Sequence, residues 1–129
     1  MDRWNAMVSA QGGDVHASLP RARHEHVITA PTTGTLTTLQ AYGVGVAAWR
    51  LGAGRARKED AIAHGAGIWL HAKPGDHVAQ GQPLMTLLTD DESRFDAAIA
   101  ELNGAYEVGG EPMDRLPLII ERLDEFTKE

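Results

Sequence analysis

Short β-branched and apolar segments bounded by glycine and proline restrict the fold of this chain more than any other feature. Two of the connections, residues 31–34 and 73–76, contain both proline and glycine and are typical of tight turns. β-Branched residues favour extended backbone. The pattern therefore predicts short strands at residues 26–30, 35–39, 68–72 and 83–88, with a last strand at 106–108.

Helical segments alternate with these strands. The segment 41–51 has small side chains on several faces, so that a second backbone can approach it closely. The segment 92–103 is amphipathic, and Asp90 and Asp91 at its start suit the helix dipole. Residues 116–126 have apolar side chains at helical spacing, which predicts a terminal helix. The small residues of the first helix are Gly43, Gly45, Ala47 and Ala48.

The first residues resemble the end of a helix. Trp4, Met7 and Val8 fall at helical spacing, and the pair Gly12-Gly13 stops the pattern. Together the segments follow the order ββαβββα after this opening helix. Strands and helices grouped in this way indicate the α+β class.

Length and charge limit what the chain can do. Its 129 residues match one domain, and the absence of cysteine rules out a disulfide framework and agrees with a cytoplasmic protein. The net charge is −6, and residues 90–129 hold 12 acidic and 4 basic residues. Nucleic acid and anionic membranes require a positive face, so neither is an expected partner. No apolar run approaches the roughly 20 residues of a membrane span.

The glycine-rich basic stretch LGAGRARKED, residues 51–60, is a candidate for phosphate binding. Anions favour helix N-termini, whereas this stretch follows the end of the helix at 41–51. Glycine and basic residues are what a helix C-terminus requires. We expect a positive φ at Gly52 or Gly54 for this reason. We interpret the set as structural residues, with anion contact as the alternative: Gly52, Gly54, Arg55, Lys58 and Asp60.

The motif GDHVAQGQPL, residues 75–84, resembles a turn and strand that recur in biotinyl and lipoyl carrier domains. Such a carrier needs a lysine at an exposed hairpin tip, usually between two methionines, and that hairpin is absent. Lys58 and Lys73 are the lysines in the body of the chain, and neither has such neighbours. The motif more readily indicates shared β geometry than a carrier function.

Histidines and serines offer no clear reaction centre. His24 and His26 would share one face of a strand, and His71 and His77 could meet across the turn at 73–76. Zinc requires three or four converging ligands, so surface histidines are the preferred interpretation. The serines lie outside any GxSxG context, and no serine has an evident base.

Taken in order, several of these stretches resemble the C-terminal domain of the pyrimidine-nucleoside phosphorylases, including thymidine phosphorylase. The resemblance covers about residues 4–112, and the order and spacing of its motifs make it specific. The stretches are AQGGD (10–14), VITAPTTGTL (27–36), GVAAWRLGAGRARKEDAI (45–62), AGIWLHAKPGDHVAQGQPL (66–84) and AYEVGGEP (105–112).

The resemblance implies an α/β-hammerhead related to the barrel-sandwich hybrid of biotinyl and lipoyl domains. Residues 1–14 would be the end of a helix from the preceding domain, and residues 15–129 the C-terminal-like domain. Members of the family catalyse reversible phosphorolysis, in which a nucleoside and phosphate give a free base and a ribose or deoxyribose 1-phosphate. Their phosphate-binding and base-binding residues precede this region. The resemblance therefore assigns no catalytic, cofactor-binding or metal-binding residue here.

The implied role is a non-catalytic structural domain of an enzyme that needs no cofactor, with phosphate as a substrate. The implied partner is the N-terminal catalytic region of the parent, which is dimeric when intact. Two positions depart from the family pattern, since Gln40 and Ala63 stand where aspartate is expected. Glutamine caps helices poorly. These departures mildly favour the alternative, a diverged stand-alone binding or interaction domain, while a carrier domain ranks third.

Overall fold

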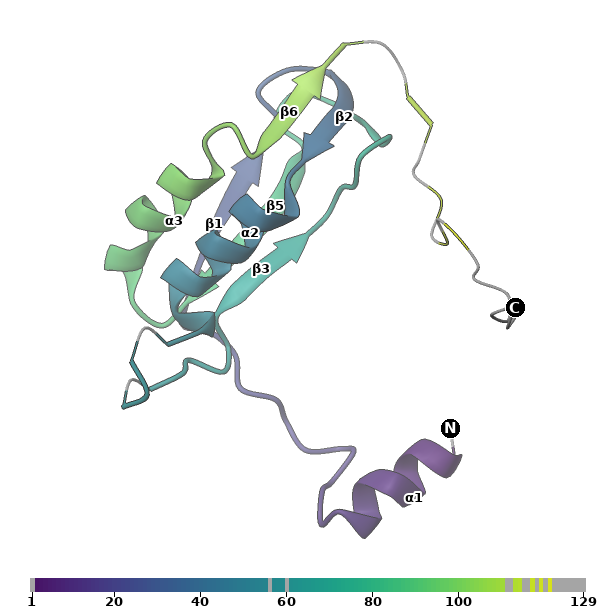
Figure 1. The fold of residues 1–129 in the computed structure, drawn as a ribbon, viewed down its shortest axis with the longest axis vertical. Coiled ribbons are helices and arrows are strands. Elements are labelled where there is room, and N and C mark those ends of the chain that lie inside the picture. Colours follow the sequence, from purple (N-terminus) through teal and green to yellow (C-terminus); the bar gives the residue numbers. More distant parts are fainter. Residues whose placement is uncertain are drawn as a thin grey trace, which may run out of the picture.

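The computed structural model describes residues 2–55, 57–59, 61–110, 113, 114, 117, 119 and 121. Strands and helices build an α+β fold with two small antiparallel sheets (Figure 1). The first sheet has the order β1-β5-β3, and the second sheet has the order β4-β2-β6. The strands are β1 (His24–Thr29), β2 (Gly34–Leu39), β3 (Gly67–Leu70), β4 (His77–Val78), β5 (Pro83–Thr89) and β6 (Tyr106–Gly109).

The first sheet is covered by helices on one face. These helices are α2 (Ala41–Ala48) with its continuation η1 (Trp49–Ala53), and α3 (Phe95–Leu102), which follows the short 3₁₀ turn η2 (Glu92–Arg94). Figure 1 shows α3 on the β1 side and α2 between α3 and β3. Because side chains alternate along a strand, each strand presents one set of residues to these helices and the other set to the opposite face.

The strand register explains where the core forms. Leu87 of β5 pairs with His26 of β1 and Ile68 of β3, and Met85 pairs with Ile28 and Leu70. Leu87 and Met85 are buried, and the core cluster continues into the helices. Burying side chains of this size is worth about 1.5–3 kcal/mol each. The core members from the helices are Ala47, Leu51, Ala98 and Leu102.

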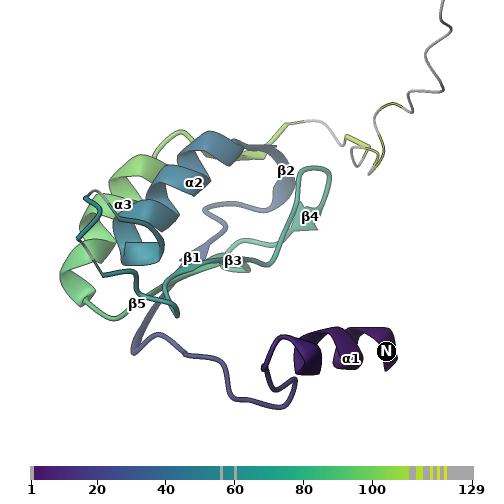
Figure 2. The same ribbon diagram turned by 60° about the horizontal axis from the view of Figure 1, so that its bottom comes forward.

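The opening helix α1 (Asp2–Ala10) ends as the sequence predicts. The N–H of Gly13 donates to the carbonyl of Val8 at 2.9 Å, and that of Gly12 donates to Ser9 at 3.0 Å. Gly12 has φ +77, so this is a Schellman motif with glycine in the left-handed position. None of the residues of α1 is buried, and the helix lies on the side of the first sheet opposite α2 and α3 (Figure 2).

Two predicted helices differ in detail from the structure. The segment 41–51 is α-helical to Ala48 and then widens into the π-helical turn η1, and the segment 92–103 opens with the 3₁₀ turn η2. The predicted loss of a cap at Gln40 is confirmed, because its side chain makes no capping hydrogen bond. Its amide donates instead to the carbonyl of Gly104 at 3.5 Å. The terminal helix predicted at 116–126 lies largely outside the described residues.

Candidate functional site

The glycine-basic stretch of the sequence begins where α2 ends. Gly52 has φ +109 inside η1, which confirms the prediction of a positive φ at one of the two glycines. Gly54 is extended, with φ −135, and a Cβ there would lie 2.6 Å from Cδ1 of Trp49. Both positions therefore favour glycine, the first for its backbone angle and the second for its close approach to an indole ring.

One basic side chain of the stretch, that of Arg55, binds the protein itself. Arg55 donates from Nη1 to the carbonyl of Lys58 at 3.2 Å, which closes a short loop. The N–H of Ala63 donates to the carbonyl of Gly52 at 3.0 Å and anchors the chain that returns from this loop. Asp60 lies outside the described residues. This loop follows the carbonyl end of a helix, where the dipole disfavours an anion.

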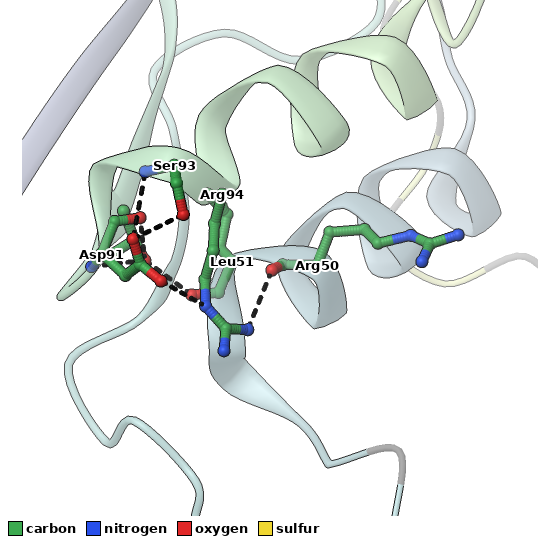
Figure 3. A network of polar contacts seen from close by, with 6 residues as sticks. Arg50, Leu51, Asp91, Ser93 and Arg94 are labelled. Carbon is green, nitrogen blue, oxygen red and sulfur yellow. Dashed lines mark hydrogen bonds and ion pairs between the residues drawn. The ribbon is translucent and has the colours of Figure 1, made fainter.

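A polar network fastens the end of α2 to the start of α3 (Figure 3). The buried hydroxyl of Thr89 donates to the carbonyl of Leu51 at 2.8 Å. Arg94 donates from Nη1 to the carbonyl of Arg50 at 3.3 Å. Carbonyls in the last turn of a helix have no partner within the helix, so these two side chains satisfy groups that the helix cannot.

The remaining contacts of the network are made by Asp91. Its Oδ1 accepts from the hydroxyl of Ser93 at 2.7 Å and from the N–H of Ser93 at 3.1 Å, and its Oδ2 lies 3.5 Å from Nε of Arg94. The hydrogen bond from the Ser93 hydroxyl, followed by that from its N–H and by the charge of Arg94, lowers the pKa of Asp91 below its ordinary value. These contacts cap η2, and the Ser93 hydroxyl is donated to a carboxylate rather than held by a histidine.

Sequence reasoning found only part of this network. It placed Asp91 at a helix start, but it missed Thr89 and Arg94 as partners of carbonyls in η1. The detectable signal is local, because Asp91 and Ser93 have the spacing of an Asx cap. The hydrogen bonds from Thr89 to Leu51 and from Arg94 to Arg50 join residues far apart in the chain. No local sequence pattern predicts them.

Three of the six histidines, His24, His26 and His71, contact side chains of other elements. His24 contacts Glu92 through Nδ1 at 3.0 Å, and the ring of His26 lies 5.5 Å from that of Phe95. These two side chains thus share a face of β1, as predicted. His71 contacts the hydroxyl of Thr86 at 2.7 Å and stacks beside Trp69 at 6.4 Å. Among the described residues, no group of three or more histidine, aspartate or glutamate side chains is placed to hold a metal ion.

Two surface hollows accompany these features. The first, of about 520 Å³, lies between α2 and β3, and we call it the α2 groove. The second, of about 570 Å³, lies on the uncovered face of the first sheet beside the exposed ring of Trp69. The α2 groove is lined by Leu39, Ala41, Val44, Gly45, Ala48, Ile68, Leu70, Lys73 and Pro74. The second is lined by Pro20, Arg21, Ala22, Glu25, Gly65, Trp69, His71, Thr86 and Leu88.

The two hollows differ in chemistry. The α2 groove is apolar apart from Lys73, and the second hollow combines Arg21, Glu25 and His71 with an indole face. Neither lining contains a serine beside a histidine base. No helix in the described part of the chain is long and apolar enough to cross a bilayer.

The chain is similar to known proteins over nearly its whole length. The chain is 46% identical to the thymidine phosphorylase of Mycobacterium tuberculosis (strain H37Rv) over 123 residues. It is 34% identical to the pyrimidine-nucleoside phosphorylase of Bacillus subtilis (strain 168) over 128 residues, and 30% identical to that of Geobacillus stearothermophilus. In each case the match covers 95% of this chain and 29% of the relative.

The matched portion has a defined place in these relatives. The profile of the family described as "Pyrimidine nucleoside phosphorylase C-terminal domain" matches residues 35–109, which is more than half of the chain. This range runs from β2 to β6 and includes both α2 and α3. The chain belongs to the pyrimidine nucleoside phosphorylase C-terminal domain family.

Proposed function

We propose that this chain is a non-catalytic domain that supports the catalytic region of a pyrimidine-nucleoside phosphorylase. The observation that carries the proposal is the coverage, because relatives named for this activity match nearly all of this chain with only 29% of their length. The network at the end of α2 adds support, since its polar side chains bind one another and backbone carbonyls.

The parent enzyme would convert a nucleoside and phosphate into a free base and a pentose 1-phosphate, without a cofactor. Its N-terminal catalytic region would be the partner of this domain, in an enzyme that is dimeric and cytoplasmic. Exposed apolar side chains support the need for such a partner. Trp4 and Met7 on α1 are 56% and 46% exposed, and Trp69 on the uncovered sheet face is 67% exposed.

We further infer that the fold is an α/β-hammerhead related to the barrel-sandwich hybrid. The support is the way the segment 75–82 links the two sheets. The N–H of Leu36 donates to the carbonyl of Asp76 at 2.9 Å, and the N–H of Ala30 donates to that of Gln82 at 2.8 Å. One short segment thus hydrogen-bonds to Ala30, directly after β1, and to Leu36 within β2. Gly52 and Gly54 would act structurally, together with Arg55, Lys58 and Asp60.

A chimera tests the proposed function. This chain replaces the corresponding C-terminal part of the M. tuberculosis thymidine phosphorylase, and release of thymine from thymidine and phosphate is measured. We expect activity in the chimera, and none in the enzyme that lacks this part or in this chain alone. A matched chimera carrying Gly52→Val should lose activity together with thermal stability, while one carrying the exposed-site change Tyr42→Ala should keep both.

Two results would contradict the proposal. One is turnover by the isolated chain in proportion to its concentration. The other is a chimera whose two parts are folded but which remains inactive. The second candidate function, a diverged stand-alone binding domain, is favoured by the hollow beside Trp69, where Arg21 and Glu25 accompany the indole ring. In that case Trp69→Ala would abolish ligand binding by the isolated chain and leave the chimera active.

A further inference from the structure

The face of the first sheet opposite α2 and α3 carries an exposed row of side chains. Val27 of β1, Thr86 of β5 and Trp69 of β3 pair directly across the three strands. The next residue along β5, Leu87, enters the core on the other face, so this row points away from the helices. Val27 is 46% exposed and Trp69 is 67% exposed. We call this surface the open sheet face, and it consists of Glu25, Val27, Trp69, His71, Thr86 and Leu88.

The indole ring of Trp69 stacks beside an ordered imidazole. The rings of Trp69 and His71 are nearly parallel, with 6.4 Å between their centroids. Nε2 of His71 lies 2.7 Å from the hydroxyl of Thr86, and this hydrogen bond fixes the imidazole. An aromatic side chain that is ordered before association loses little conformational entropy on binding. Tryptophan is also enriched among the residues that dominate the energy of protein interfaces. Trp69 therefore has the properties of an anchor for a protein partner.

The segment that enters the fold from α1 runs along the edge of this face. Residues 20–22 form one wall of the hollow beside Trp69. They approach the sheet so closely that a Cβ at Gly65 would lie 2.4 Å from the backbone nitrogen of Ala22. The chain that precedes residue 20 therefore meets the fold beside the open sheet face.

The helix α1 lies on the same side of the first sheet as this face (Figure 2). None of its residues is buried, and Trp4 and Met7 are exposed. The relatives match this chain with 29% of their length, and the family model describes a C-terminal domain, so the larger remaining part of these relatives precedes the match. A catalytic region in that position would join the fold through α1, on the side of the open sheet face.

We propose that the catalytic region of the parent enzyme packs on the open sheet face, with Trp69 as the central contact. This inference rests on the proposed function and adds the surface through which the two parts meet. Exposed apolar side chains that gather on one face mark interaction sites. The α2 groove lies on the helix-covered side of the sheet, away from α1, and stays outside this interface.

The chemistry of the open sheet face indicates what its partner surface presents. Val27 and Trp69 call for apolar side chains at the centre of the contact. Arg21 and Glu25, which line the adjoining hollow, have opposite charges and call for polar groups at its rim. The partner is thus a folded protein surface with an apolar centre.

Oxidative footprinting tests the proposal. The chimera with the M. tuberculosis enzyme and the isolated chain are exposed briefly to hydroxyl radicals, and oxidation at each residue is measured by mass spectrometry. Trp69 should be oxidised roughly tenfold or more slowly in the chimera, because a contact that excludes water removes most of its exposed surface. Tyr42 on α2 is 85% exposed and serves as the internal control, with the same rate expected in both proteins.

A pair of substitutions separates contact with the partner from a role within the domain. Trp69→Thr removes the ring and keeps a residue that suits a strand. It should lower the thermal unfolding midpoint of the chimera by more than that of the isolated chain, where the indole is exposed. The matched control Tyr42→Ala should have the same small effect in both. Equal losses from Trp69→Thr in the two proteins would assign the residue to the domain alone and overturn the proposal.

The footprint and the activity of the chimera report separately. Equal oxidation of Trp69 in an active chimera and in the isolated chain would overturn this inference and leave the proposed function intact. Protection of Trp69 in a folded but inactive chimera would support the packing and contradict the proposed function. Slow oxidation of Trp69 already in the isolated monomer would mean that the chain covers its own sheet, which overturns the proposal. Protection of the isolated chain that disappears on dilution would identify a second copy as the occupant, with the same consequence.

Discussion

Small residues lie on both sides of α2, but the surroundings of the two sides differ. On the closed side, Gly43 and Ala47 meet α3, and a Cβ at Gly43 would lie 2.7 Å from that of Ala105. On the open side, Gly45 faces the α2 groove and has no heavy atom within 4 Å of an added Cβ. Residue type alone does not say which glycine a helix needs. The neighbour across the interface decides it.

The largest expected effect lies at the end of α2, where Gly52 and Gly54 can be compared directly. Gly52→Val forces a side chain into a backbone with φ +109 and should lower the free energy of unfolding by about 1–3 kcal/mol. Gly54→Val should cost less, because the backbone there is extended and the crowding ring of Trp49 is 38% exposed and can shift. Urea unfolding of both variants measures the difference. Unchanged midpoints in both would refute the account of this helix end.

The matched pair Gly43→Ala and Gly45→Ala tests the two sides of α2 themselves. Alanine at position 45 should raise the free energy of unfolding by roughly 0.5–1 kcal/mol, because alanine favours helix over glycine. Alanine at position 43 gains the same propensity but crowds Ala105, and overpacking costs about 1–3 kcal/mol. We therefore expect opposite signs in denaturant unfolding. Equal shifts in the two variants would mean that the closed side is not tightly packed.

The smallest expected effect concerns Asp91, which accepts hydrogen bonds from Ser93 and lies beside Arg94 at the start of η2. Because the pKa of Asp91 is lowered in the folded state, its contribution to stability is present above its unfolded pKa and is lost as the pH falls through its folded pKa. Asp91→Asn should therefore reduce the unfolding midpoint near neutral pH and have progressively less effect in acid. Thermal unfolding across that range measures it. A deficit that is constant with pH would assign the effect to packing rather than to charge.

Much of the architecture followed from local patterns. Turn residues at 31–34 and 73–76 marked the ends of strands, and the pair Gly12-Gly13 marked the end of α1, because backbone angles there depend on the residue and its immediate neighbours. The π-helical widening at Trp49–Ala53 was not predicted. Thr89 and Arg94 bind carbonyls of that turn from another part of the fold.

The sequence by itself determined the class of the fold, the positions of most strands and helices, and the family, since motif order and residue preference are properties of the chain. Only the tertiary structure decided which glycine is crowded, which carbonyls Thr89 and Arg94 satisfy, and which side of α2 stays open. The physical reason is that these features depend on contacts between residues distant in sequence. Such contacts exist only after the helices have been placed against the sheet.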